Sequence, residues 1–130
     1  MSADEKFTAI TKVRAILSTN PTISEMVGNK IFPLTAPSEV GGVKIEGDLI
    51  LYQRDGYRRE DNKMGITRQR SIFYIIAISD NYDRSLTLAL SIYETLDGEH
   101  SAEGFRIKLE DYTEEYVDKK FFQILQFSIE

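Results

Sequence analysis

The chain has no cysteine, no tryptophan, three prolines and one histidine among its 130 residues. Without cysteine it has no disulfides, no thiolate metal ligands and no cysteine nucleophile. No run approaches the ~20 apolar residues of a membrane span. The first residues, MSADEKFTAITK, lack the apolar core of a signal peptide. We therefore expect synthesis and residence in a cytosol and no membrane partner.

The residues needed for catalysis are also scarce. The one histidine, His100, lies in Asp97–Ser101, which the sequence predicts as a surface loop, and a lone histidine lacks the partners that a triad or a metal site requires. The acidic residues near the C-terminus do not have the spacing of a calcium-binding EF-hand loop. No phosphate loop, dinucleotide fingerprint or serine elbow is present. We expect no catalytic residue, no metal, no cofactor and no enzymatic activity.

The residues that are present predict one α+β domain spanning residues 1–130, because 42% of them are apolar, enough for a packed core. Apolar residues at helical spacing predict two main helices, Ala3–Leu17 and Asn81–Leu96, with a short helix between Thr22 and Val27. Strands are predicted over Asp48–Gln53, Thr67–Ser79, Phe105–Asp111 and Lys119–Ile129. The expected fold is a mostly antiparallel four-stranded sheet of two β-hairpins, with both main helices on one face, in the order α, short α, ββ, α, ββ.

Two patterns predict which surfaces are buried. The helix Asn81–Leu96 is expected to bury the stripe Leu86, Ala89, Leu90, Tyr93 and Leu96, broadened by Leu88 and Ile92, and to pack on the sheet through Leu86, Ala89, Leu90 and Tyr93. The strand Thr67–Ser79 is apolar on both alternating faces over Ile72–Ile78. This predicts a central strand that is covered on both sides, or covered on one side and engaged with a partner on the other.

The polar span Gln53–Arg70, between two apolar strands, has six basic and three acidic residues, a net +3 in a chain of −5. The region Glu94–Glu130 has ten acids and four bases, a net −6. Opposite charges on one small domain favour assembly with other chains, although a polar hairpin tip is also an ordinary solvated surface. The candidate interface residues are Arg54, Tyr57, Arg58, Arg59, Lys63, Arg68 and Arg70 in a basic arm at residues 54–70, and Glu110, Glu114 and Glu115 in the acidic region.

Several segments, in order, resemble a family of phage and prophage tail components. Ile23–Pro33, reading ISEMVGNKIFP, with Ala36-Pro37 after it, is similar to the family's opening: a short helix ending in glycine, a basic-apolar-aromatic-proline run and an Ala-Pro turn. Leu49–Gln53 resembles its apolar-apolar-Tyr-Gln strand, and Asp83–Gly98 resembles its middle helix ending Leu-Asp-Gly. The resemblance extends to Ile129. It departs from the family where the connector lacks a proline-rich lead into the first strand, and where the arm is longer and more charged.

The resemblance implies a tail-completion or head–tail joining protein of long-tailed phages, similar in fold to tail terminators. Such proteins are not enzymes and form rings, often hexameric, at the end of the tail tube. The implied partners are the chain itself, tail-tube proteins and head-connector proteins, with no small-molecule substrate, and the implied location is the virion tail. The net acidity argues against nucleic acid as the main partner. Two alternatives stay open: a small α+β ligand-binding or regulatory module, and a small enzyme that uses carboxylates alone.

Overall fold

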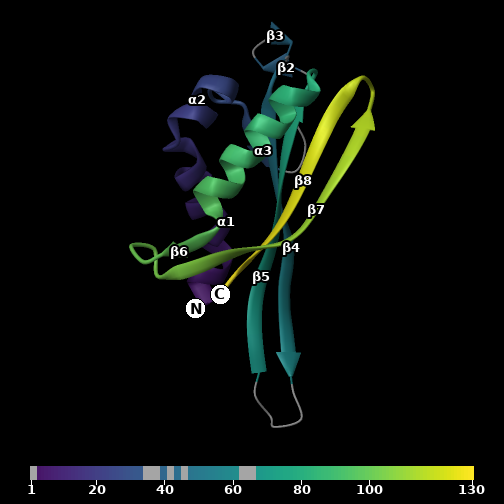
Figure 1. The fold of residues 1–130 in the computed structure, drawn as a ribbon. Helices are drawn as coiled ribbons and strands as arrows, with labels where there is room; N and C mark the ends of the chain where they lie inside the picture. The colour runs from purple at the N-terminus through teal and green to yellow at the C-terminus, as the bar shows by residue number, and fades with distance from the viewer. Residues whose placement is uncertain (1–2, 34–38, 41–42, 45–46, 62–66) are drawn as a thin grey trace.

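A computed structural model describes residues 3–33, 39–40, 43–44, 47–61 and 67–130 (Figure 1). For residues 3–8, 39–44, 55–61 and 67–70 the description covers backbone alone. The helices are α1 (Ala3–Ser18), α2 (Pro21–Val27) and α3 (Tyr82–Leu96). The main sheet runs in the order β1 (Ile31–Pro33), β4 (Leu49–Asp61), β5 (Thr67–Ser79), β8 (Lys120–Ile129), β7 (Phe105–Val117) and β6 (Gly98–His100). A separate small hairpin joins β2 (Glu39–Val40) to β3 (Val43–Lys44).

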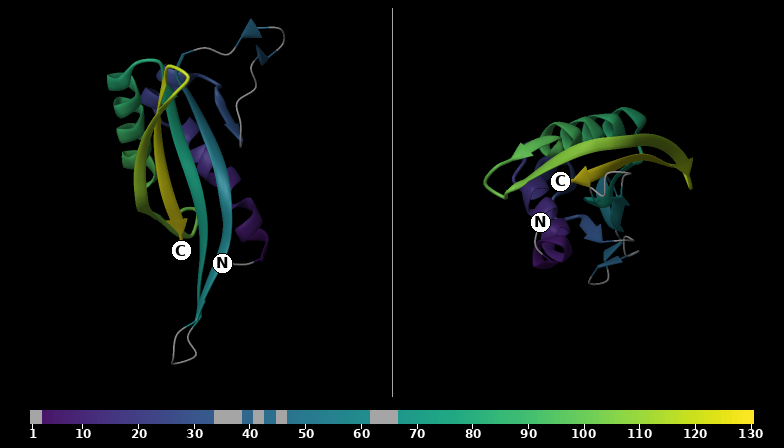
Figure 2. Two further views of the ribbon diagram at one scale, coloured as in Figure 1. Left: turned by 90° about the vertical axis from the view of Figure 1, so that its right-hand side faces the viewer. Right: turned by 90° about the horizontal axis from the view of Figure 1, so that it is seen from below.

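The α+β class is confirmed, and the four predicted strands form the middle of the sheet as two antiparallel hairpins, β4–β5 and β7–β8. The sheet itself differs from the prediction, because it has six strands and is mixed. Strand β1 runs parallel to β4, with Ile31 opposite Ile50, and β6 adds to the other edge. Each added strand is three residues long, too short for a periodic pattern to reveal it. Figure 2 shows the sheet curled, with the helices behind it in the left view.

Two strands run further than their apolar residues indicate. The predicted ends were Gln53 and Asp111, but β4 pairs with β5 as far as Asp61, and β7 pairs with β8 as far as Val117. Tyr112–Val117, which the prediction left between two strands, therefore belong to β7. Only Asp118 and Lys119 form the turn, with φ of 52° and 66°. At the β7–β8 end, side chains add to the backbone pairing, since Tyr112 and Glu114 bond to Gln123 and the Tyr116 ring contacts Phe121.

The core lies between the sheet and all three helices. Phe73 of β5 and Phe127 of β8 stack with ring centroids 5.4 Å apart, and they pack with fully buried residues of all three helices. Helix α2 begins where the Asn20 side chain accepts a hydrogen bond from the Ile23 N–H, 3.2 Å away. It ends at Gly28, whose φ of 59° suits glycine. These caps direct the chain from the helices into β1.

The face of α3 that packs on the sheet matches the predicted one only in part. The buried residues are Ser85, Leu88, Ala89, Ile92 and Leu96. Leu90 is 56% exposed and Tyr93 is 39% exposed, so placing them in the core was wrong. The helix carries two neighbouring apolar stripes, and both satisfy the helical period. Periodicity therefore does not decide which stripe is buried.

Candidate functional site

An open apolar groove of about 300 Å³ lies between α3 and β7. It is lined by Leu86, Ala89, Leu90, Tyr93, Leu109, Tyr112 and Leu125. Its helix side is the stripe that the sequence assigned to the core, and its strand side is the part of β7 that α3 leaves uncovered. Pockets of this size with apolar linings are typical binding sites for small molecules or for side chains of a partner.

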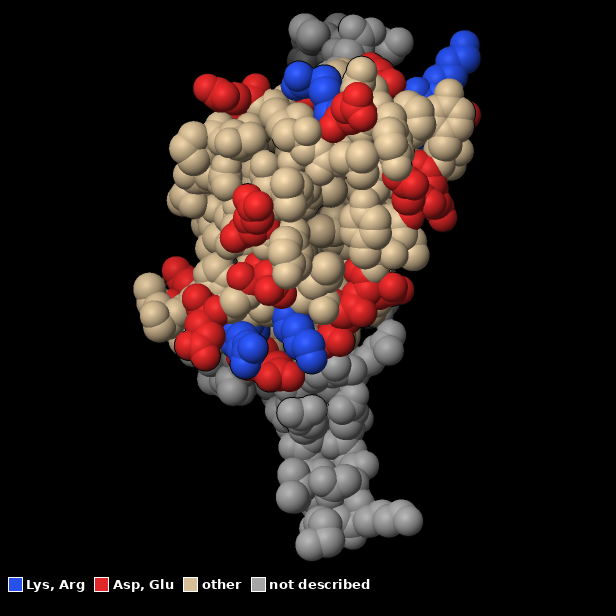
Figure 3. Space-filling model, in the orientation of Figure 1, with Lys and Arg blue, Asp and Glu red and all other residues tan. Residues whose placement is uncertain are grey.

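Exposed aromatic residues continue from the groove toward the tip of the β7–β8 hairpin. Tyr82 at the start of α3 is 42% exposed and Tyr116 of β7 is 61% exposed. Both contact the ring of Phe121, at centroid distances of 5.3 and 4.7 Å. Figure 3 shows this face as largely uncharged through its middle, with acidic side chains more frequent than basic ones around it. Exposed apolar and aromatic side chains with charged residues around them are characteristic of protein–protein contact.

A buried polar network links the helix and the strands that line the groove. The Gln123 amide is fully buried, and its Nε2 donates to Ser85 Oγ at 3.2 Å and to Glu114 Oε1 at 2.8 Å. Its Oε1 accepts the Tyr112 hydroxyl, and the Ser85 hydroxyl donates to the Tyr82 carbonyl at 2.6 Å. Both ends of the buried amide are thus bonded. The network fixes α3, β7 and β8 relative to one another.

The same network sets the protonation of its members. Hydrogen bonds from Gln123 and then Tyr82 lower the pKa of Glu114 below its ordinary 4.5, although desolvation opposes them. The hydrogen bond to Glu114 raises the pKa of Tyr82, and burial followed by the Glu114 charge raises the pKa of Tyr112. At neutral pH Glu114 therefore stays charged and both tyrosines stay neutral. None of these shifts prepares a group for proton transfer near neutral pH.

The outer edge of β7 lacks a partner strand over most of its length within the described part of the chain. Strand β6 pairs only with Phe105–Ile107. The Leu109 N–H donates instead to Asp97 Oδ1 at 3.0 Å, and the Tyr112 N–H donates to Asp111 Oδ1 at 2.8 Å. In an antiparallel pair, alternate residues direct N–H and C=O away from the partner strand. Val117 pairs with Lys120 beside the turn. Alternation from this pair directs the N–H and C=O groups of Tyr116 and Glu114 away from β8.

The structure separates the two predicted groups of interface residues. Of the acidic group, Glu110 accepts the Ser128 hydroxyl at 2.7 Å, Glu114 belongs to the network, and Glu115 is exposed on β7. Of the basic group, Arg54 is exposed on β4 and Lys63 lies outside the described residues. Only the backbone is described for Tyr57, Arg58, Arg59, Arg68 and Arg70. The β4–β5 end projects from one end of the molecule and the β7–β8 hairpin from the other (Figure 1).

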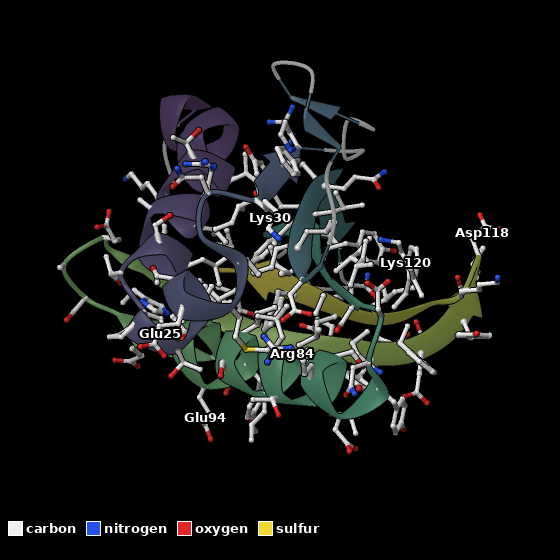
Figure 4. The ribbon with its side chains drawn as sticks, turned by 90° about the horizontal axis from the view of Figure 1, so that it is seen from above. Glu25, Lys30, Arg84, Glu94, Asp118 and Lys120 are labelled. Carbon is white, nitrogen blue, oxygen red and sulfur yellow. The ribbon has the colours of Figure 1, made fainter. Side chains whose placement is uncertain are left out.

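Sequence reasoning missed an ion pair at the start of α3, between the buried Asp48 and the exposed Arg84. Asp48 is 6% exposed. Its Oδ1 accepts the Ser79 hydroxyl at 2.6 Å, and its Oδ2 accepts Arg84 Nε at 2.7 Å. Asp48 thereby holds the pKa of Arg84 above its ordinary value. These contacts join the residue before β4, the end of β5 and the first turn of α3, where Figure 4 labels Arg84, which makes the cluster structural. Nothing in the spacing of these residues along the chain indicates that they meet.

His100 is not in a surface loop as predicted. It ends β6 and is half-buried, with Nε2 2.7 Å from the Leu96 carbonyl oxygen and its ring against Phe105. These contacts give it a packing role. Among the described residues, no group of three His, Cys, Asp or Glu side chains is arranged to hold a metal ion. The described helices include none that is long and apolar enough to cross a membrane.

No family model matches the chain, and no curated protein matches it. Among solved structures, the fold matches a chain from "Virion of native gene transfer agent (GTA) particle" with a TM-score of 0.67. The two sequences are 16% identical, and the match covers 90% of this chain and 89% of the other. The two chains therefore share one fold over nearly their whole lengths.

Proposed function

We propose that this chain is a structural subunit of a phage-like virion, and that it acts by binding other protein chains and not by catalysis. The observation that supports this most directly is the fold shared with a chain of the gene transfer agent virion across nine-tenths of this sequence. The segments that resemble phage tail components support the same proposal independently, since they rest on residues and not on the fold.

The specific role proposed is tail completion or head–tail joining, as a ring at the end of the tail tube. A ring uses one patch on each subunit against a different patch on the next. The chain offers two such surfaces: a basic end at the β4–β5 hairpin, and an acidic, apolar face around the groove. The partners are then other copies of this chain, the tail tube and the head connector.

Deleting the gene from the strain that encodes it tests this role. Electron microscopy should show full heads and tails that stay unjoined, and supplying the chain from a plasmid should restore complete particles. An antibody against the chain should label the head-proximal end of the tail. Normal particles at normal titre in the deletion strain would refute the proposal.

The groove also gives some support to the alternative of a ligand-binding module. Its volume is at the lower end of the range for small-molecule sites, about 300–1,000 Å³. Such sites orient a ligand through a few convergent polar groups, but the Tyr112 hydroxyl is already bonded to Gln123. Native mass spectrometry of protein purified from its own host distinguishes the two, because a ligand module would carry a stoichiometric small molecule that Leu90→Asp removes.

A further inference from the structure

We infer that the free edge of β7, Leu109–Val117, with the groove beside it, receives the basic arm of a second copy by strand addition. The added strand is the outer edge of β4, Gln53–Asp61. This deepens the proposed function and rests on it, because it names the contact through which successive subunits of the ring would meet.

The receiving edge is open and shaped for a strand. Strand β7 continues beyond its contact with β6, and the backbone groups of Glu114 and Tyr116 point outward. The N–H of Tyr112 is bonded only by the adjacent Asp111 carboxylate, which an incoming carbonyl can displace. An exposed sheet edge of this kind recruits an extended segment through main-chain hydrogen bonds, and neighbouring pockets take alternate side chains. Here the apolar groove supplies the pocket.

Within the described residues, the outer edge of β4 has no partner strand over Gln53–Asp61, a segment as long as Leu109–Val117 of β7. Strand β1 pairs with β4 only from Ile50 to Tyr52, and β8 pairs with β5 only from Ser71 onward. Beyond these points the described β4 and β5 form a two-stranded ribbon that projects away from the body (Figures 1 and 2). Isolated two-stranded ribbons are marginally stable in water. A third strand from a neighbouring copy would therefore stabilise the arm.

Charge selects a second copy as the occupant. The acceptor strand carries Glu110, Asp111, Glu114 and Glu115, and the whole arm, Gln53–Arg70, carries a net +3. Within the arm, the added strand Gln53–Asp61 has three bases and three acids, so the net +3 comes from Lys63, Arg68 and Arg70. Two β7 edges repel each other, and so do two arms, but an arm and a β7 edge attract. Exposed ion pairs contribute only ~0–1 kcal/mol each, so charge sets the choice and the rate while the groove and the backbone hydrogen bonds supply affinity. Tyr57 is the arm residue best suited to the groove, because tyrosine dominates many interface contacts.

The placement of the two edges permits a closed ring. The arm leaves one end of the molecule and the β7–β8 hairpin extends toward the other (Figure 1). One copy can therefore donate its arm and accept another arm at the same time. Contacts of this type propagate from subunit to subunit and close when the rotation per step allows it.

A photo-crosslinking residue in the arm tests the inference without assuming a register. Tyr57→p-benzoylphenylalanine is made in ¹⁵N-labelled protein, mixed with unlabelled protein and irradiated, and the crosslinked peptides are mapped by mass spectrometry. Crosslinks between labelled and unlabelled chains should concentrate on Leu109–Val117 and on the groove face of α3. The control carries the same group at Ala102, an exposed residue of the β6–β7 turn, and should show no such concentration.

Variants with reversed charges test whether the charges of the arm and of β7 contribute to the contact. Arg58→Glu with Arg59→Glu should lower the crosslinking yield about fivefold to tenfold, as loss of one or two exposed ion pairs implies. Asp111→Lys with Glu115→Lys on the receiving copy should restore part of it, and added salt should lower the wild-type yield. Glu114 is left unchanged because Gln123 and Tyr82 hold it. Crosslinks that fall elsewhere, arm-to-arm crosslinks, or none at about 1 mM protein would overturn the inference.

The same variant in the particles of the encoding strain separates this inference from the proposed function. If the chain is present in the particles and crosslinks to the β7 edge of another copy, the strand addition and the virion role are both supported. If it is present but crosslinks only to other proteins, the strand addition is wrong while the virion role holds. If the chain is missing from the particles, the proposed function itself fails.

Discussion

Two leucines on the same helix, Leu88 and Leu90, should lose very different amounts of stability when each is replaced by alanine. Leu88 is fully buried in the core, whereas Leu90 is 56% exposed in the groove. Leu88→Ala leaves a cavity and should lower the free energy of unfolding by about 2–5 kcal/mol. Full burial of a leucine contributes about 1.5–3 kcal/mol, and Leu90 is less than half buried. Leu90→Ala should therefore cost about 1 kcal/mol or less.

Urea denaturation followed by circular dichroism measures both effects. With an m-value of about 2 kcal/mol/M, a loss of 3 kcal/mol lowers the midpoint by about 1.5 M. The two variants remove the same atoms from one helix, so helix propensity cancels between them. Leu90→Ala should in addition reduce the crosslinking of the arm to the groove, while Leu88→Ala affects it only through unfolding. Equal losses of stability would refute the assignment of the buried face.

Three further changes test other parts of the structure. Ser79→Ala removes a buried hydroxyl that donates to Asp48 and accepts the Asn81 N–H at 3.1 Å, and should cost about 1–3 kcal/mol in thermal or urea unfolding; a neutral result would show these hydrogen bonds to be incidental. Because the pKa of Glu114 is lowered by folding, its stabilisation is present above pH 4.5 and is lost as pH falls through the folded pKa; stability measured from pH 7 to pH 3 should fall less in Glu114→Gln than in wild type. Lys119→Gly relieves a non-glycine residue at φ 66° and should raise stability by roughly 1 kcal/mol, an effect that a lower melting temperature would contradict.

The fold class followed from the sequence because long elements carry strong periods. The apolar run Ile72–Ile78 and the alternation of Phe105, Ile107 and Leu109 match the observed burial. The short strands β1 and β6 did not show as periodic segments, although Lys30–Phe32 has the composition of an edge strand. Their pairing depends on where neighbouring strands lie and not on their own residues.

The candidate site was less accessible to sequence reasoning than the fold. The charge difference between arm and C-terminal region is visible in composition alone. The groove is not, because it arises where α3 turns the Leu88–Ile92 stripe inward and leaves Leu90 outside. The buried position of Gln123 was equally hidden, since a glutamine among Phe122, Ile124 and Leu125 looks like an exposed residue of a strand. Its burial depends on the partners that α3 and β7 provide.

The row of carboxylates on β7 also restricts how free subunits can associate wrongly. Two copies that met edge to edge through β7 would place four acidic residues of each strand close to those of the other, and like charges opposite each other destabilise a strand pair. This repulsion keeps an open edge soluble before assembly, in the way that charged residues protect other edge strands. Salt therefore has two opposing effects on the free protein, because it weakens the attraction between arm and edge and also weakens the repulsion between identical edges. Turbidity on storage should consequently increase with added salt, while crosslinking of the arm to the β7 edge decreases.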